Sequence, residues 1–114
     1  MSDCIFCKIV NKEIPSAVVY EDNEILAFKD IYPVAPVHIL IIPKKHLAST
    51  NELEEEDALL TGKMIMVARD IARKEGIEES GYRILTNCGP DSRQEVMHLH
   101  FHLIGGKKLG GNIG

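Results

Sequence analysis

Residues 94–106 read QEVMHLHFHLIGG, and three histidines in this stretch alternate with three apolar residues over positions 98–103. Successive side chains of a β-strand point to opposite faces, so the three imidazoles are expected on one face and the apolar side chains on the other. The apolar face can pack against a helix, which leaves His98, His100 and His102 in a row on the open face. The pattern therefore predicts a strand over residues 97–104 that carries a row of histidines.

Two kinds of chemistry fit such a row. In the first, all three imidazoles bind one metal ion. However, the Cα atoms of His98 and His102 would lie about 13 Å apart on an extended strand, and zinc needs ring nitrogens within about 2.1 Å. In the second, the central His100 attacks an electrophile as a neutral imidazole, and a protonated neighbour stabilises charge on a phosphoryl oxygen. Geometry favours the second interpretation.

The rest of the sequence predicts two helices and four further strands. The expected elements are a helix over 3–11 capped by Asp3, a hairpin of strands 17–20 and 25–28, a loop over 30–36, a strand over 37–42, a long helix from a cap at Thr50 or Asn51 to Gly76, a strand over 82–86 and a mobile glycine-rich tail over 105–114. Strands grouped around one main helix indicate an α+β fold with a mostly antiparallel sheet.

Length and composition restrict the class of protein. A chain of 114 residues has room for one domain over 1–114. A net charge of −4 gives no field that would gather a nucleic acid backbone. No apolar run approaches the roughly 20 residues that span a bilayer, and no basic-then-apolar leader begins the chain. Three cysteines fit a reduced protein better than a disulfide scaffold. We expect a soluble cytoplasmic domain without nucleic acid or membrane partners.

The histidine stretch and several upstream blocks resemble the histidine-triad (HIT) family, and specifically its Hint-like branch. The blocks are QEVMHLHFH at 94–102 followed by LIGG, CIFCKI at 4–9, AFKDI at 27–31, IPKKH at 42–46, GYR at 81–83 and Asn87. The match covers nearly the whole chain except the tail. The resemblance implies a five-stranded antiparallel sheet with two helices per subunit. It also implies a homodimer, joined through the long helix and an edge strand into a ten-stranded sheet.

The resemblance also implies a reaction. Family members cleave purine nucleoside phosphoramidates, or related AMP conjugates, through a covalent nucleotidyl-histidine intermediate. By position, His100 is the nucleophile, His102 contacts the phosphate and His98 orders the row. The alternative is a nucleotide- or zinc-binding regulatory module that keeps the fold without catalysis. The presence of the full histidine row together with Asp30, Asn87 and Gln94 favours the enzyme.

Positions that match the family's substrate site are spread over three segments. They are Phe28, Asp30, Ile31, Asn87, Arg93, Gln94 and Val96. The resemblance implies that Asp30 accepts hydrogen bonds from the ribose hydroxyls, that Phe28 and Ile31 help to form the base pocket, and that Asn87 and Gln94 contact the phosphate. Taken without the resemblance, Asp30 reads as a turn residue and Phe28 as part of the core.

Two departures from the family pattern lie beside the histidine row. Arg93 replaces the glycine that normally precedes Gln94, and adds a positive charge near the phosphate. Glu95 stands where well-known relatives carry serine. A protonated Glu95 would donate its proton to the departing amine as a catalytic acid, an ionised one would repel the phosphate, and one that points to solvent would do neither. All three roles remain open.

Cys4 and Cys7 form a Cys-x-x-Cys pair without a second such pair in the chain. In some family members the histidines matching His46 and His98 complete a Cys2His2 site, an arrangement typical of structural zinc. The other interpretation is two reduced, buried thiols, with His46 hydrogen-bonded to His98. The sequence thus leaves open a structural zinc ion at Cys4, Cys7, His46 and His98, while the chemistry proposed for His100 needs no cofactor.

Overall fold

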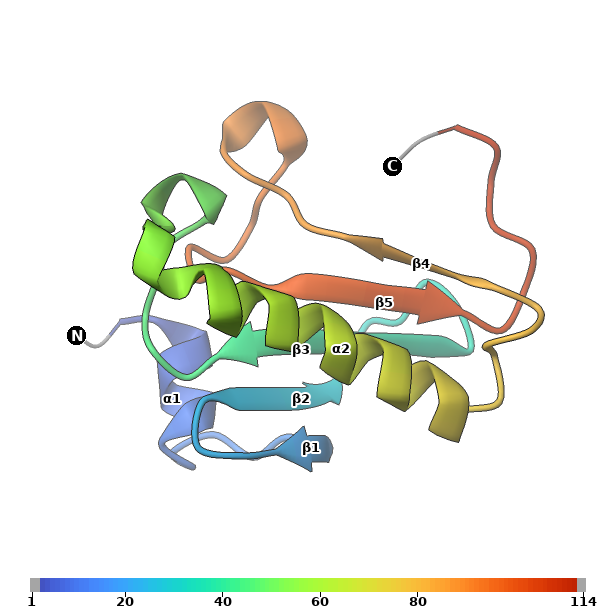
Figure 1. Ribbon diagram of the computed structural model, residues 1–114, viewed down its shortest axis with the longest axis horizontal. Helices are drawn as coiled ribbons and strands as arrows, with labels where there is room; N and C mark the ends of the chain where they lie inside the picture. Colours follow the sequence, from blue (N-terminus) through green and yellow to red (C-terminus); the bar gives the residue numbers. More distant parts are fainter. Residues whose placement is uncertain (1–2, 113–114) are drawn as a thin grey trace.

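The computed structural model describes residues 3–112 and contains one antiparallel sheet of five strands in the order β1-β2-β3-β5-β4 (Figure 1). The strands are β1 (Val18–Glu21), β2 (Ile25–Lys29), β3 (Val37–Pro43), β4 (Tyr82–Leu85) and β5 (Phe101–Gly105). Two helices, α1 (Ile5–Val10) and α2 (Ala58–Lys74), complete the α+β fold, and the expected fold class is confirmed. No helix in the described part of the chain combines the length and hydropathy needed to cross a membrane.

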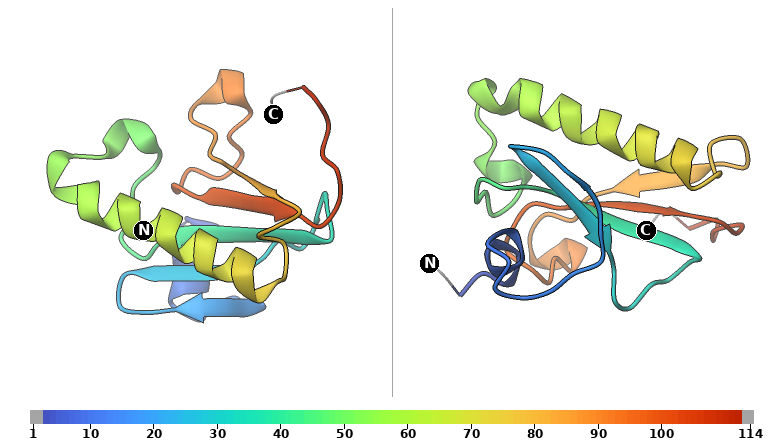
Figure 2. Two further views of the ribbon diagram at one scale, coloured as in Figure 1. Left: turned by 45° about the vertical axis from the view of Figure 1, so that its right-hand side comes forward. Right: turned by 90° about the horizontal axis from the view of Figure 1, so that it is seen from below.

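The central strand β3 is buried on both faces because each face of the sheet is covered by one helix. Ile39 and Ile41 belong to a core cluster with the buried face of α2. Leu40 and Ile42 pack in a second cluster with Phe6 of α1. The view from below shows α2 on one side of the sheet and α1 on the other (Figure 2). This double burial explains why residues 37–42 are continuously apolar apart from one histidine.

Both helices begin later than the sequence predicts. Cys4, and not Asp3, caps α1, and its Sγ atom accepts a hydrogen bond from the Cys7 backbone N–H at 3.3 Å. The expected start of the long helix at Thr50 or Asn51 is wrong. Two short 3-10 turns precede α2, namely η1 (Thr50–Glu52) and η2 (Glu55–Asp57). They cannot join into one helix because Leu53 between them adopts an extended conformation, with ψ at 135°.

The end of α2 agrees with the sequence. Gly76 has a φ of +74°, which a side chain would disfavour. The Ile77 N–H donates to the Ala72 carbonyl at 3.0 Å, and the Gly76 N–H donates to the Arg73 carbonyl at 3.1 Å. These two bonds form a Schellman motif that satisfies carbonyls left free by the last helical turn.

The strand predicted over residues 97–104 is shorter at its N-terminal end. β5 pairs with β3 from Phe101 opposite Ile41 to Gly105 opposite Val37. Further pairing would bring the preceding residues opposite Pro43, which has no N–H to donate. The Pro43 carbonyl instead lies 2.8 Å from Nε2 of the His98 ring. His98 and His100 therefore precede the strand, and only His102 of the three histidines lies within it.

The glycine-rich tail predicted over 105–114 also has a different boundary. Gly105 is the last residue of β5. Beyond it, the Gly110 carbonyl accepts a hydrogen bond of 3.0 Å from the Arg83 guanidinium of edge strand β4. Residues 113 and 114 of the predicted tail lie outside the described residues.

Gly105 provides a test of this packing. A Cβ atom at Gly105 would lie 2.8 Å from Cδ1 of Ile77 and 3.2 Å from the Gly81 carbonyl oxygen. Because backbone atoms cannot move aside cheaply, Gly105→Ala is expected to lower the free energy of unfolding by about 1–3 kcal/mol in urea denaturation. Gly110→Ala is the control, since no atom lies within 4 Å of its added Cβ. Equal stability of the two variants would contradict the close approach at Gly105.

Candidate active site

The three histidines lie on the face of the sheet that α1 covers. His100 is held by one short contact, in which its Nδ1 atom lies 2.7 Å from the His98 carbonyl oxygen. A carbonyl can only accept, so Nδ1 carries the proton and donates it. In the neutral ring the remaining nitrogen, Nε2, then holds the lone pair. In this tautomer Nε2 is the ring nitrogen of His100 that can attack an electrophile or accept a hydrogen bond.

His98 and His100 are closed to solvent and His102 is partly exposed, which corrects the expectation of an open row of histidines. His98 is completely buried and His100 is 7% exposed. The ring of Phe6 from α1 packs edge-on against both imidazoles, with centroids 5.9 and 5.1 Å away. The expected alternation of faces is confirmed for the apolar residues, because Leu99, Phe101 and Leu103 all lie in the core cluster beneath α2.

Burial also determines the charge of these rings. Desolvation lowers the pKa of His98 and of His100 below the ordinary value. The pKa of His102 falls to about 4, chiefly because the ring is buried and secondarily because His100 and His38 lie beside it. At neutral pH burial therefore opposes the protonated imidazole that the sequence analysis expects beside His100. His102 is uncharged there, and it can act on an anion only through an N–H group.

A fourth histidine, His38 of β3, joins the site. Its Nε2 atom lies 2.9 Å from Nδ1 of His102 and 3.4 Å from the Asp30 carboxylate. Asp30 follows β2 and accepts a hydrogen bond from the Tyr32 backbone N–H at 2.8 Å, which is the turn geometry that sequence alone suggests. The sequence analysis missed His38 because only the strand order places β3 between β2 and β5.

The remaining positions that match the family's substrate site differ in their exposure. Phe28 is buried in the cluster with Phe6, whereas Ile31 is 81% exposed on the loop after β2. Asn87 is half-buried and lies between β4 and the loop that carries Gln94. Arg93 is exposed and has a φ of +66°, a left-handed conformation that suits glycine better. This conformation explains physically why a glycine is expected at the position.

The Gln94 side chain makes hydrogen bonds within the protein that the sequence did not reveal. Its side-chain nitrogen donates to the carbonyls of Ala48 and Val96, at 2.7 and 2.9 Å. Its side-chain oxygen accepts a hydrogen bond from the Gly89 backbone N–H at 2.9 Å. All amide protons of this side chain are thus used within the protein. Gln94 therefore fixes the loop between β4 and β5 through its side chain.

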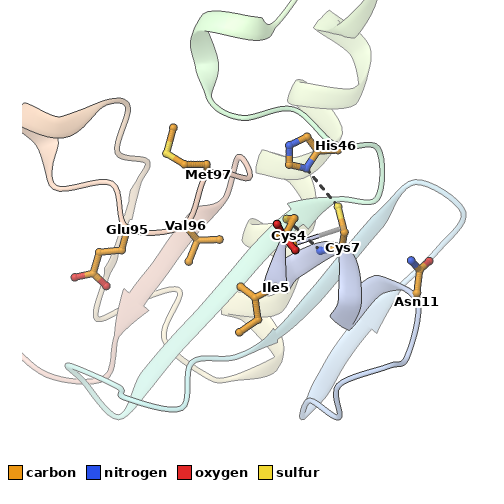
Figure 3. A pocket seen from close by; sticks show the side chains of 9 residues that line it. Cys4, Ile5, Cys7, Asn11, His46, Glu95, Val96 and Met97 are labelled. Atoms are coloured by element: carbon orange, nitrogen blue, oxygen red, sulfur yellow. Dashed lines mark hydrogen bonds between the residues drawn. The ribbon is translucent and has the colours of Figure 1, made fainter. Parts of the chain in front are cut away.

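An open groove of about 910 Å³ is lined by α1 and its flanking residues, by His46 and by the segment 95–97 (Figure 3). Glu95, Val96 and Met97 form one side of it, and Cys7 and His46 lie at the other. The Glu95 side chain is exposed and points away from the two cysteines. The groove therefore has one wall with Glu95 and apolar side chains and an opposite wall with Cys7 and His46.

Beside this groove, four side chains form a compact set of possible metal ligands, namely Cys4, Cys7, His46 and His98. Nδ1 of His98 lies 3.3 Å from Cys4 Sγ, 3.6 Å from Cys7 Sγ and 3.2 Å from His46 Nδ1. Its Nε2–H donates to the Pro43 carbonyl, so Nδ1 carries a lone pair toward the cluster. With Zn–S and Zn–N bonds of about 2.3 and 2.1 Å, tetrahedral ligand atoms lie about 3.4–3.8 Å apart. The four side chains therefore fit one zinc ion.

The metal site formed by all three triad histidines, which geometry disfavoured at the outset, has no counterpart among the described residues. Two groups of side chains there are close enough to share an ion: Cys4, Cys7, His46 and His98, and separately Asp30, His38 and His102. His98 and His102 belong to different groups. The short segment 98–102 thus connects two distinct sites through His100.

The fold and about half of the sequence are shared with known proteins. A family model described as "Scavenger mRNA decapping enzyme C-term binding" matches residues 3–112. The chain is 48% identical over 108 residues to purine nucleoside phosphoramidase of Escherichia coli K12, covering 95% of this chain and 91% of that protein. It is 49% identical over 109 residues to a 14 kDa zinc-binding protein of Brassica juncea, covering 94% and 96%.

Solved structures give the same result. A HIT family hydrolase from Legionella pneumophila Philadelphia 1 superposes with a TM-score of 0.96 at 46% identity, covering 98% of this chain and all of that one. A HIT family hydrolase from Clostridium thermocellum also gives a TM-score of 0.96, at 47% identity, with 99% and 98% covered. The chain belongs to the histidine-triad family.

Proposed function

We propose that this protein hydrolyses purine nucleoside 5′-phosphoramidates, or related AMP conjugates, through a covalent nucleotidyl-histidine intermediate on His100. The observation that carries the proposal is the 2.7 Å contact between His100 Nδ1 and the His98 carbonyl, which leaves Nε2 as the nucleophilic atom. The relatives named purine nucleoside phosphoramidase, at 48% identity over almost the whole chain, support the substrate class.

The reaction divides into two displacements. In the first, the lone pair of His100 Nε2 forms a bond to the α-phosphorus while the P–N bond breaks, and the leaving amine takes a proton. In the second, water attacks the phosphorus and loses a proton to solvent, the bond between phosphorus and His100 Nε2 breaks, and the nucleoside monophosphate leaves. The hydrogen bond to His98 holds the ring in one tautomer throughout, so the same nitrogen attacks and departs.

Substrate recognition follows from the residues around the row. Asp30 is proposed to accept hydrogen bonds from the ribose hydroxyls through its carboxylate. Phe28 and the exposed Ile31 are proposed to contact the purine, whose apolar surface needs no base-specific partner. Selection of nucleotides with a free ribose would then depend on Asp30, and tolerance of either purine on the apolar contacts.

The loop before the row is proposed to serve the phosphate and the leaving group. Asn87, Val96 and the positively charged Arg93 would lie on the phosphate side. Gln94 would contribute by holding the loop, because its side chain already bonds to three backbone groups. Glu95 faces the groove next to Val96, where it could protonate a departing amine or repel a second anionic group.

The nucleophile can be tested without removing its orienting contact. In His100→Asn, the shorter amide can still donate to the His98 carbonyl but has no nucleophilic nitrogen. We expect phosphoramidate turnover to fall by about three orders of magnitude or more, with AMP affinity measured by calorimetry largely retained. His100→Ala would show the same loss together with lower stability, because the buried ring leaves a cavity. More than a tenth of the wild-type rate in the Asn variant would contradict the assignment.

We also propose that Cys4, Cys7, His46 and His98 bind one structural zinc ion. The ligand distances and the lone pair of His98 Nδ1 support a closed tetrahedral site, which carries no open position for substrate. The bound ion would tie α1 to the segment that precedes β5. Its contribution would be to stability and to the position of His98, and no step of the reaction needs it.

Zinc binding is expected to be stoichiometric and to depend on the paired cysteines. Protein purified without chelators should contain about one zinc per chain by elemental analysis. Cys4→Ser should lose the metal and melt about 5–10 °C lower. Cys88→Ser is the matched control, since Cys88 lies outside the ligand set and contacts Ser49. A metal-free wild-type protein that takes up no added zinc would leave the interpretation of two reduced thiols.

The protein is further proposed to be a homodimer. The outer face of α2 exposes Leu59, Ile65 and Met66, at 74%, 46% and 48%. Strand β4 is an edge of the sheet, so one row of its backbone groups is available to a second chain. An interface through α2 and β4 would bury these side chains and extend the sheet to ten strands.

A single charge on α2 should test the dimer. Sedimentation equilibrium at micromolar concentration is expected to give twice the 12.7 kDa mass of one chain. Met66→Glu should shift the protein toward the monomer, because a buried, unpaired carboxylate is costly at an interface. Met97→Glu is the control, since Met97 is 54% exposed, lines the groove and belongs to neither α2 nor β4. A stable wild-type monomer would contradict the proposal.

A further inference from the structure

His38 is a buried histidine that the proposed reaction does not use. It is 7% exposed and lies on β3, on the same face as Leu40 and Ile42. The neighbouring strands place Asp30 on one side of it and His102 on the other. A histidine buried between two polar groups at the candidate active site must have a defined proton arrangement.

The backbone determines which nitrogen of His38 carries the proton. The Val34 backbone N–H lies 3.1 Å from Nδ1 of His38. A backbone N–H can only donate, so Nδ1 must accept and must hold the lone pair. Burial lowers the pKa of His38, which favours the neutral ring. Its single proton therefore lies on Nε2.

The protonated nitrogen of His38 in turn determines the tautomer of His102. The Nε2–H of His38 is 2.9 Å from Nδ1 of His102, closer than the 3.4 Å to the Asp30 carboxylate. Nδ1 of His102 consequently accepts, and the proton of the neutral His102 ring lies on Nε2. Among the described residues, Nε2 of His102 is the only buried side-chain nitrogen or oxygen without a hydrogen-bond partner. An N–H donor is left unsatisfied beside His100, whose ring centroid is 5.0 Å away.

We propose that His38 is a positioning residue that fixes His102 in its Nε2–H tautomer, so that His102 donates a hydrogen bond to a phosphoryl oxygen as a neutral group. The chain of bonds runs from the Val34 backbone through His38 and His102 to the substrate. It begins at a fixed amide, so the ring that meets the phosphate cannot present a lone pair to the anion. This inference rests on the proposed nucleotide substrate for the identity of the final acceptor.

The proton arrangement can be observed directly in the wild-type protein. Two-bond nitrogen–proton correlation spectra of the histidine side chains at pH 7 distinguish protonated from unprotonated ring nitrogens. Nε2 is expected to be the protonated nitrogen in both His38 and His102, with Nδ1 unprotonated. A proton on Nδ1 of His102 would overturn the proposal. This measurement needs no substrate, so it is independent of the proposed enzymatic activity.

Two substitutions at one position test the functional consequence. His38→Leu fills the buried site but offers no donor, whereas His38→Gln has an amide N–H close to the position of the imidazole Nε2. We expect His38→Leu to lose about tenfold in phosphoramidate kcat, as for the loss of one hydrogen bond to a charged group, and His38→Gln to recover most of the rate. Ile39→Val, the next residue of β3 but on the α2 face, is the control for strand packing.

The outcomes separate the inference from the proposed function. Equal rates for His38→Leu and His38→Gln, whether both low or both normal, would overturn the positioning role, because a purely structural effect does not distinguish an amide donor by its hydrogen bond. The spectrum of His102 in His38→Leu should also show a mixture of tautomers, and an unchanged single tautomer would likewise count against it. Absence of any wild-type turnover would instead reject the phosphoramidase proposal, with the proton arrangement still measurable.

Discussion

The hydrogen bond from His100 Nδ1 to the His98 carbonyl is the contact on which the rest of the site depends. This hydrogen bond places the proton of His100 on Nδ1 and leaves Nε2 unprotonated. The carbonyl that accepts it belongs to His98, which is completely buried. His98 is held through its ring by the Pro43 carbonyl and through the following peptide by a 2.6 Å bond from the Leu99 N–H to the Leu47 carbonyl. Its second ring nitrogen faces Cys4 and Cys7. A metal ion bound there would restrain the same residue that orients the proposed nucleophile.

Pro43 explains why this geometry differs from a simple strand. Because proline has no N–H for the hydrogen-bond ladder between β3 and β5, the segment that precedes β5 does not pair with β3 at Pro43. The Pro43 carbonyl is then available to the His98 ring. The imidazoles of His98 and His100 are then buried beneath Phe6 instead of lying on an open face. Burial of so many polar rings is tolerated since the rings are neutral and nearly every nitrogen is paired. Among the fully buried side-chain nitrogens of the described residues, the exception is Nε2 of His102, the atom proposed to donate a hydrogen bond to an anionic substrate.

Much of this arrangement follows from the sequence, and the rest depends on information that local patterns lack. The α+β fold, the end of α2 at Gly76 and the packing of Leu99, Phe101 and Leu103 beneath the helix follow from periodicity and turn chemistry. The start of β5 does not, because it depends on a proline in a different strand. His38 could not be recognised without the order of the strands. The charge of His102 could not be foreseen either, since it depends on burial in the folded protein and on His38, which lies 64 residues away in the sequence.

The proposed function requires that Nε2 of His100 form a covalent bond to the α-phosphorus during turnover. Rapid acid-free quenching of the enzyme during hydrolysis of a tryptamine adenosine phosphoramidate, followed by mass spectrometry of the intact chain and its peptides, tests this most directly. The account predicts an adenylyl adduct on the peptide that contains His100, localised to that residue by fragmentation and absent from His100→Asn. An adduct on any other residue, or turnover by His100→Asn at the wild-type rate, would contradict it.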